Sequence, residues 1–316
     1  MMNYLTPILT VCLCLWSLAD PVALRAEVWP EEGRADDLYL NNGRLQIGID
    51  RERGGAIFHL SDVSRRKNLL NHADEGRFVQ QSYYGNPDGS TWWNTPWCWN
   101  PIQGGGSNGR RARIISLKRS KKSVRVVTEP VQWATGVPAT ECEMEERIEL
   151  QGMVAHVHYT FRNTGETAQD HAERAHEVPA VFADWSLNTF VTYSGSRPWQ
   201  HDTLTRFVPR LLSNAAGGES AVLSESWAAY VDEKGYGIGV YSPIATECTL
   251  YRFGEGPGGP TSGSCSYFAP LVRLAITRGM VYSYDVYLTI GSLDEIRDRF
   301  YALHRKNEKR KKAKTP

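Results

Sequence analysis

Two histidines and an arginine share one face of a predicted strand over residues 154–162, which read VAHVHYTFR. Side chains alternate between the two faces of a strand, so His156, His158 and Arg162 point the same way. We predict that His158 takes part in catalysis and that His156 and Arg162 bind a substrate, because imidazole and guanidinium groups suit proton transfer and the binding of polar ligands. The opposite face is predicted to be core: Ala155, Val157, Tyr159 and Phe161.

The spacing of the two histidines also allows a divalent metal ion. His156 and His158 stand two residues apart, and Glu145 or Glu146 from the preceding predicted strand could be a third ligand. We favour hydrogen-bonded histidines without a metal, and we predict no cofactor.

A second group of polar side chains lies in residues 171–185, HAERAHEVPAVFADW. His176 is predicted to act as a general acid or base, because an imidazole titrates near neutral pH. Glu177 is predicted to be a catalytic carboxyl group, although it could instead only close a turn. Asp184 stands among apolar residues, where a carboxylate needs a partner, and we predict that it binds substrate.

The segment from Gln80 to Gly106 holds four of the ten tryptophans and a single charged residue, Asp88. Its apolar residues follow neither a helix nor a strand period and stand among turn-forming residues, which predicts a long loop. Aromatic faces interleaved with amides and hydroxyls suit a sugar ring. Alternatively, the tryptophans only cap a β-sandwich. The predicted substrate-binding residues are Trp93, Trp97, Trp99, Asn100 and Gln103.

Three reactions use the residue types available. Hexose ring opening needs one acid and one base, which His176 with Glu177 or Glu247 could supply. Hydrolysis needs two carboxyl groups about 5 to 10 Å apart, and Glu177 with Asp184 is the nearest pair in the sequence. β-Elimination from a uronic acid polymer needs a base, a proton donor and a group that neutralises the carboxylate; the candidates are Tyr83, Tyr84, His176, His158, Arg77, Asn100 and Gln103. The predicted catalytic residues are His176, Glu177, His158, Tyr84 and Arg77.

The elements that position these groups are predicted to be mostly strands. Asn42-Gly43 is a hairpin turn signal, and short alternating runs recur between turn residues along the chain, which predicts an antiparallel sandwich. Residues 292–306, SLDEIRDRFYALHRK, predict a helix, because Ser292 and Glu295 have capping-box spacing and the apolar residues form one stripe. We predict one all-β domain over residues 27–305 with this C-terminal helix packed on it.

Both ends of the chain are predicted to lie outside that domain. Residues 1–19 contain an apolar run and a small-x-small pattern typical of a signal peptide, so we predict a secreted or periplasmic protein. A retained membrane anchor is the alternative, but the run is short for a membrane helix. Residues 306–316 predict a basic disordered tail. The net charge of +1 gives no reason to expect a nucleic acid partner, and the oligomeric state stays open.

Four cysteines follow the predicted leader: Cys98, Cys142, Cys248 and Cys265. Their spacings do not match a zinc-finger pattern. Cys248 and Cys265 flank a Gly/Pro-rich stretch that a disulfide could close, and free buried thiols are the alternative.

Three short motifs resemble a known family. LNNG at residues 40–43 with LQIGID at 45–50 and RGGAI at 53–57 is similar to the first hairpin of the galactose mutarotase-like β-supersandwich, and HYTFRNTG at 158–165 resembles its mid-chain strand. The resemblance implies an antiparallel β-supersandwich that offers the concave face of a sheet to a carbohydrate. It also implies a general acid at His176, or less closely His171, and a general base at Glu247.

Residues 76–87, GRFVQQSYYGNP, with residues 96–105, PWCWNPIQGG, also resemble a group of secreted bacterial proteins of unassigned activity. We therefore predict a secreted protein acting on an oligo- or polysaccharide in a concave groove, as a polysaccharide lyase or glycoside hydrolase. The alternatives are a non-catalytic carbohydrate-binding protein and an aldose epimerase. Catalysis predicts that His156, His158 and His176 converge in a pocket walled by Trp97 or Trp99, and histidines that are scattered or sealed in the core would favour binding alone.

Overall fold

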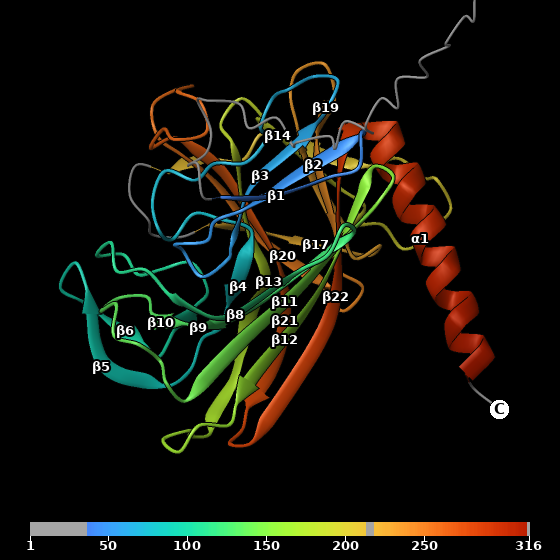
Figure 1. Ribbon diagram of the computed structural model, residues 1–316. Coiled ribbons are helices and arrows are strands. Elements are labelled where there is room, and N and C mark those ends of the chain that lie inside the picture. The colour runs from blue at the N-terminus through green and yellow to red at the C-terminus, as the bar shows by residue number, and fades with distance from the viewer. Residues whose placement is uncertain (1–36, 213–217, 315–316) are drawn as a thin grey trace, which may run out of the picture.

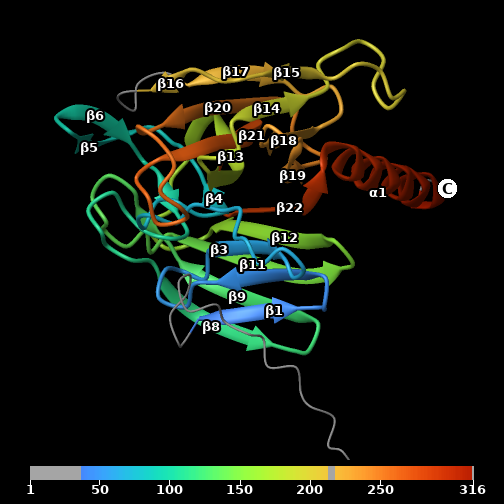
Figure 2. The same cartoon turned by 90° about the horizontal axis from the view of Figure 1, so that it is seen from above.

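Two large sheets face each other across one apolar core (Figures 1 and 2). The computed structural model describes residues 37–212 and 218–314. The first sheet has nine strands in the order β15-β14-β18-β19-β22-β12-β11-β9-β8, and all its pairs are antiparallel. Its strands are β8 (Arg113–Arg119), β9 (Ser123–Glu129), β11 (Cys142–Gln151), β12 (Val154–Asn163), β14 (Thr189–Thr192), β15 (Thr205–Phe207), β18 (Trp227–Val231), β19 (Tyr236–Tyr241) and β22 (Met280–Ser292).

The second sheet has eight strands in the order β10-β7-β4-β13-β21-β20-β16, with β17 also paired to β20. Its pairs are antiparallel except for β16 with β20. Its strands are β4 (Gln80–Ser82), β7 (Pro101–Ile102), β10 (Val131–Gln132), β13 (His171–Asp184), β16 (Leu211–Leu212), β17 (Glu219–Val222), β20 (Glu247–Phe253) and β21 (Cys265–Ile276).

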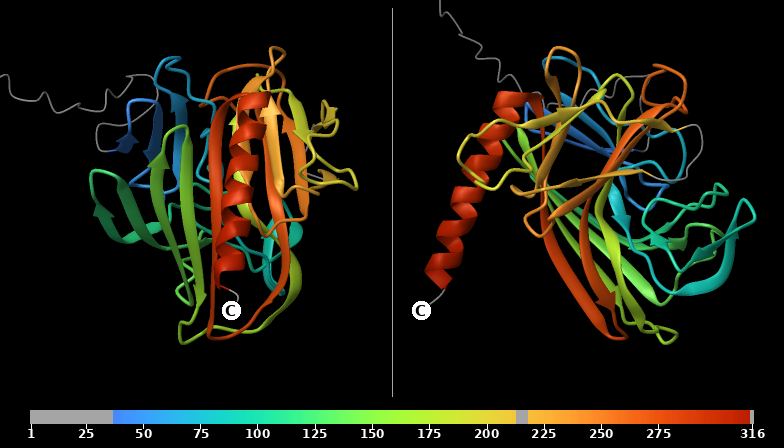
Figure 3. Two further views of the ribbon diagram at one scale, coloured as in Figure 1. Left: turned by 90° about the vertical axis from the view of Figure 1, so that its right-hand side faces the viewer. Right: turned by 180° about the vertical axis from the view of Figure 1, so that it is seen from behind.

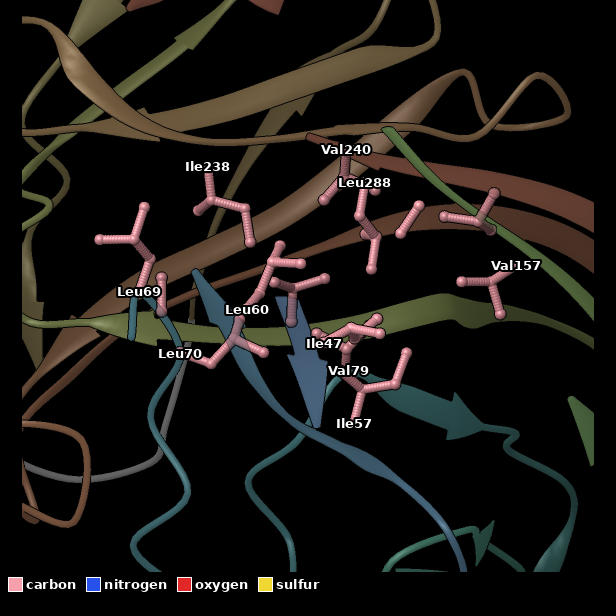
Figure 4. Packing of buried hydrophobic residues seen from close by; sticks show 14 of the residues in the cluster. Ile47, Ile57, Leu60, Leu69, Leu70, Val79, Val157, Ile238, Val240 and Leu288 are labelled. Carbon is pink, nitrogen blue, oxygen red and sulfur yellow. The ribbon is translucent and has the colours of Figure 1, made fainter. Parts of the chain in front are cut away.

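A three-stranded sheet completes the core. It consists of β1 (Leu38–Asn41), β2 (Leu45–Ile49) and β3 (Ile57–Asp62). The predicted turn at Asn42-Gly43 joins β1 to β2, and Gly43 has the positive φ of 82° that such a turn requires. Figure 4 shows side chains of this sheet meeting side chains of β12, β19 and β22.

Strict alternation explains how the core forms. In β12, Ala155, Val157 and Tyr159 are fully buried in the core, as predicted. In β13, Val178 and Val181 enter the same core from the other side. Every second side chain on each sheet must therefore point away from the core, so the sandwich has two separate outer faces.

The helix α1 (Leu293–Lys314) covers part of the outer face of the nine-stranded sheet (Figure 3). Its cap is the predicted one, because the Ser292 and Glu295 side chains each bond the other residue's backbone N–H. Leu293, Ile296 and Phe300 pack on β14, β18, β19 and β22. The helix runs through residues 306–314, so the predicted disordered tail was wrong there: Lys and Arg favour helices, particularly near their C-terminal end.

The segment from Gln80 to Gly106 is not a long loop, contrary to our prediction. It contains β4, β7 and a hairpin of β5 (Pro87–Trp92) and β6 (Thr95–Cys98), which projects beyond the sheets in Figure 1. The strands are short and polar, so they lack the alternation by which a half-buried strand is recognised.

Of the two alternatives for Cys248 and Cys265, the structure has the free buried thiols and not the disulfide. All four cysteines of the described ranges are free, and Cys248 lies opposite Pro270 whereas Cys265 lies opposite Phe253, five rows further along the same strand pair. The predicted leader, residues 1–19, lies outside the described residues. Within residues 37–212 and 218–314, no helix is long and apolar enough to cross a membrane.

Candidate active site

The outer face of the eight-stranded sheet carries a carboxyl group held by hydroxyls. Glu177 follows the buried His176 on β13, so its side chain points away from the core and is half-buried. The hydroxyl of Tyr267, on the neighbouring strand β21, donates a hydrogen bond to Glu177 Oε1. Burial raises the pKa of Glu177, and hydrogen bonds from Tyr267, Tyr84 and Ser82 oppose the rise. A carboxyl group in this setting can gain or lose a proton closer to neutral pH than an ordinary glutamate can.

An open cavity of about 520 Å³ lies over this carboxyl group. Aromatic rings continue from it along the face: Tyr251 stacks on Tyr267 at 4.4 Å between ring centroids, and Phe182 lies 4.6 Å from Tyr267. Phenol rings and hydroxyls side by side suit the apolar and polar faces of a sugar. The residues that line the cavity are Tyr84, Cys98, Glu173, Arg174, Ala175, Glu177, Thr249, Leu271 and Arg273.

The two arginines of the cavity differ in their pairing. Arg273 Nε lies 3.3 Å from Glu247 Oε1. Arg174 is exposed and has no hydrogen-bond or ion-pair partner in the described part of the chain. A guanidinium group without a partner can bind a carboxylate of a ligand through two parallel hydrogen bonds.

A second carboxyl group lies in the same row of the sheet. Glu177 is opposite Leu271, and Leu271 is opposite Glu247. Adjacent strands are ~4.8 Å apart, so the two backbone positions are roughly 10 Å apart across the cavity floor. Glu177 and Glu247 are thus two carboxyl residues in one row of the sheet, separated by a single strand.

His176 does not reach the cavity. Its ring is fully buried beside Tyr83, in the space between the two sheets. Its Nδ1 accepts a hydrogen bond from the Tyr84 backbone N–H (3.1 Å), and its Nε2 donates one to the Leu274 carbonyl (3.0 Å). Burial lowers its pKa to about 4, so the ring is neutral at neutral pH. His176 therefore joins β13 to its two neighbouring strands, and the geometry assigns it no contact with a ligand.

His171, the weaker match for the general acid, is also structural. It stacks on Trp99 with 4.0 Å between ring centroids, and its Nδ1 accepts a hydrogen bond from the backbone N–H of Asn86. Burial lowers its pKa.

Three predicted substrate-binding residues of the tryptophan-rich segment lie inside the protein. Trp99 is buried, and its indole N–H donates to Glu141 Oε1. Asn100 donates to the Tyr83 carbonyl at 2.7 Å. Gln103 is fully buried beside Glu146, whose pKa burial raises to about 8. These side chains satisfy backbone and interior groups, so the predicted contact with substrate was wrong for them.

Trp97 and Trp93 remain near the surface. Both belong to a cluster with Trp92 of the β5–β6 hairpin and Trp133 from the segment after β10, and Trp93 is 86% exposed. They lie on the side of the molecule that holds the cavity, because Cys98 at the end of β6 lines it.

The polar face of β12 lies on the other side of the molecule. His156 Nε2 and His158 Nδ1 are 2.7 and 3.0 Å from the same oxygen of Asp285, which lowers the pKa of that carboxyl group to about 2. Arg162 pairs with Glu143 and with Glu145. The apolar core separates this outer face from the cavity, so the predicted convergence of three histidines was wrong.

This face does not form the metal site that we considered. Glu145 is occupied by Arg125 and Arg162, and Glu146 points into the core. Across the described ranges 37–212 and 218–314, no three His, Cys, Asp or Glu side chains gather in a way that could hold a metal ion.

Arg77 and Asp184 fix chain segments. Arg77 donates to the Gly263 carbonyl (2.6 Å) and pairs with Asp74 (3.0 Å). Asp184 accepts hydrogen bonds from the backbone and hydroxyl of Ser186. It is seven residues along β13 from Glu177, roughly 20 Å at ~3.3 Å per residue, which is too far for the predicted pair of carboxyl groups.

Neither Arg174 nor Tyr267 was among the catalytic residues predicted from the sequence. For Arg174 the sequence gave no signal, because alternation in residues 173–177 places it on the same face of β13 as His176, and only the lining of the cavity shows that it lies there. Tyr267 comes from a strand almost a hundred residues later, and only its pairing with β13 shows the contact.

Comparison with solved structures identifies the fold. The chain aligns with a galactose mutarotase related enzyme from Lactobacillus acidophilus at 11% identity and a TM-score of 0.52, over 81% of this chain and 98% of that one. A galactose mutarotase-like protein from Lactobacillus casei aligns at 12% identity and a TM-score of 0.49, over 80% and 99% of the two chains. The alignment with the Lactobacillus acidophilus structure shows that the chain has a galactose mutarotase-like β-sandwich fold, which confirms the predicted fold class.

Comparison at the sequence level adds no family. No protein-family model matches the chain, and no curated protein sequence matches it.

Proposed function

We propose that the protein is a carbohydrate-active enzyme that uses Glu177 as its acid–base group, and that its reaction is β-elimination from an acidic polysaccharide. The observation that carries this proposal is that Glu177, Tyr84 and Arg174, which has no partner among the described residues, line one open cavity, while Tyr267 donates a hydrogen bond to Glu177. The fold is consistent with it, since the aligned protein is described as a galactose mutarotase related enzyme.

Each group has a step in this reaction. Arg174 binds the carboxylate of the uronic acid, which stabilises negative charge on the adjacent carbon. The Glu177 carboxylate takes the proton from that carbon, the carbon–carbon double bond forms, and the bond to the glycosidic oxygen breaks. Tyr84, which lines the cavity, gives its hydroxyl proton to the leaving oxygen. A base works best with a pKa near the working pH, and burial shifts Glu177 in that direction.

Glycoside hydrolysis is the second candidate, and Glu247 is the observation that favours it. Its place in the same row as Glu177 supplies the two carboxyl groups that hydrolysis needs. One would protonate the leaving oxygen while the other activates a water.

The histidines no longer support catalysis. Catalysis by the histidines required His156, His158 and His176 to meet in one pocket, and their separation favours a protein that only binds carbohydrate. The burial of His176 also removes the ring-opening reaction in which it would be the acid. The hydrogen bonds of Glu177 with Tyr267 and Tyr84 are independent of the histidines, and they support an enzymatic function. An extracellular polymer also fits the predicted leader at residues 1–19, so secretion or a periplasmic location is included in the proposal.

A polysaccharide panel tests the proposal. The purified protein is incubated with polygalacturonate, alginate, hyaluronan, xylan and mannan, and the ultraviolet absorbance of unsaturated ends and the reducing ends are both followed. We expect unsaturated ends from an acidic polymer, a loss of at least ~1,000-fold in Glu177→Gln, and a weaker effect of Glu247→Gln. Reducing ends without unsaturation, abolished in both variants, would indicate hydrolysis. Binding without turnover in the wild-type protein would show that it is not an enzyme.

A further inference from the structure

The β5–β6 hairpin ends in an unusual turn. Trp93 and Asn94 both have positive φ, 47° and 60°, and they form the two-residue connection between the strands. Positive φ at both positions is the type I′ pattern, which favours Asn and Gly and is costly for a bulky side chain. The chain thus holds an exposed tryptophan in a turn at a cost in stability, and such strain is a pointer to function.

Four indole rings gather at this tip. Trp92 lies 5.8 Å from Trp93, 5.7 Å from Trp97 and 4.9 Å from Trp133, measured between ring centroids, and Trp97 is also 4.9 Å from Trp133. Trp133 comes from the segment after β10, so the cluster is built from two separate parts of the chain. Trp93 forms its outer surface, with 86% of the residue exposed.

The hairpin is fastened to the body of the protein. The Gln132 side-chain amide lies 2.9 Å from Asp88 Oδ2, from Ser90 Oγ and from the Cys98 carbonyl. These contacts hold both strands of the hairpin to β10. A fastened aromatic surface loses little freedom when it binds a ligand.

The hairpin is continuous with the cavity. Cys98, its last residue, lines the cavity next to Tyr84, and Trp93 stands five residues earlier, roughly 16 Å along an extended strand. A ligand that occupies the cavity and reaches Trp93 must therefore be a chain of several sugar units. A monosaccharide in the cavity could not touch it.

The composition of the hairpin fits a glycan. Residues 87–98, PDGSTWWNTPWC, contain no Lys or Arg and no aliphatic side chain larger than proline. A surface that docks on a membrane would be expected to carry Lys or Arg for anionic lipids. Exposed indole faces beside hydroxyl and amide groups match the alternating C–H and O–H surfaces of sugars.

We propose that the tryptophan cluster is a distal subsite on which the polysaccharide chain stacks while its reacting bond lies at Glu177. The substrate is then a polymer bound along its length, and affinity rises with the number of sugar units until the chain reaches Trp93. The location of the reacting bond rests on the function proposed above, whereas the stacking itself does not.

Trp93→Asn tests the subsite, because asparagine accepts positive φ and keeps the turn while the ring is lost. Retention in gels containing the polymers of the panel is compared with that of the wild-type protein and of Val281→Ala, which removes another exposed apolar side chain. Calorimetry with oligogalacturonides and oligoalginates from disaccharide to octasaccharide measures the length dependence. We expect Trp93→Asn to bind the long chains about tenfold more weakly than the wild type and to bind the disaccharide equally well. Val281→Ala should bind every chain length like the wild type.

Two results would overturn the subsite: equal affinity of Trp93→Asn and wild type at every chain length, or no retention of the wild-type protein by any gel. Glu177→Gln separates this inference from the proposed function. That variant should be retained like the wild type even though its turnover is lost. If turnover persists in Glu177→Gln while Trp93→Asn still loses retention, the proposed reaction fails and the subsite stands.

Discussion

The two outer faces of the sandwich both carry polar side chains, but they use them differently. On the nine-stranded sheet, His156 and His158 share Asp285, and Arg162 is paired with two glutamates. On the eight-stranded sheet, Glu177 is held by uncharged hydroxyls and Arg174 has no partner within the described residues.

This difference shows why the number of functional groups on a face is a poor guide to a site. Ion pairs at the surface contribute little to the stability of the fold, and their charged groups are already occupied when a ligand arrives. A carboxyl group whose partners are neutral keeps its ability to exchange a proton, and an unpaired guanidinium keeps its donors. Three sets of variants test this difference between the two faces.

Tyr267→Phe should have the largest effect. Turnover is expected to fall about 100-fold, because the carboxyl group loses the donor that orients it. That hydrogen bond also lowers the pKa of Glu177, so its loss raises the pKa. A base must be deprotonated, so the acidic limb of the pH–rate profile should move to higher pH. Tyr251→Phe, which removes a hydroxyl from the neighbouring stacked ring, is the matched control, and an unmoved profile in Tyr267→Phe would contradict the role of Glu177.

His176→Ala should reduce stability by about 2 kcal/mol, since the Tyr84 N–H and the Leu274 carbonyl lose their buried partner. Denaturant unfolding measures the change. Any loss of turnover should follow from misplacement of Tyr84. A variant that keeps its stability and loses all activity would instead restore His176 as a catalytic residue, as the sequence suggested.

The double variant His156→Ala and His158→Ala should have the smallest effect. Both rings are partly exposed and pair with one surface carboxylate, so we expect a loss below about 1 kcal/mol and unchanged turnover on the panel. Loss of turnover with normal stability would move the active site to the nine-stranded sheet.

Most of the fold followed from the sequence because it depends on local patterns. Alternation identified the core face of β12, the Asn42-Gly43 turn identified the first hairpin, and Ser292 with Glu295 identified the start of α1. The β5–β6 hairpin was missed because its tryptophans pack on one another and not on the core. The helix beyond residue 306 was missed because a charged run was interpreted as solvated coil.

The candidate site was harder to predict because it depends on which strands become neighbours. Glu177 was identified, yet its neighbour His176 received the leading role, although the two must point to opposite faces of β13. The contact with Tyr267 and the row shared with Glu247 exist only through the β13-β21-β20 pairing. Asn100 and Gln103 carry the amide groups that are typical of a sugar-binding site. Only their burial in the structure shows that they bind other parts of the protein instead.

The buried Glu146 makes the stability of the fold depend on pH. With a pKa of about 8 against an ordinary 4.5, it keeps its proton at neutral pH, whereas the unfolded chain releases it. Unfolding therefore sets a proton free between these two values, and the contribution of this group to stability is complete below pH 4.5 and declines as the pH rises toward 8. With respect to this residue, the protein is best suited to mildly acidic surroundings.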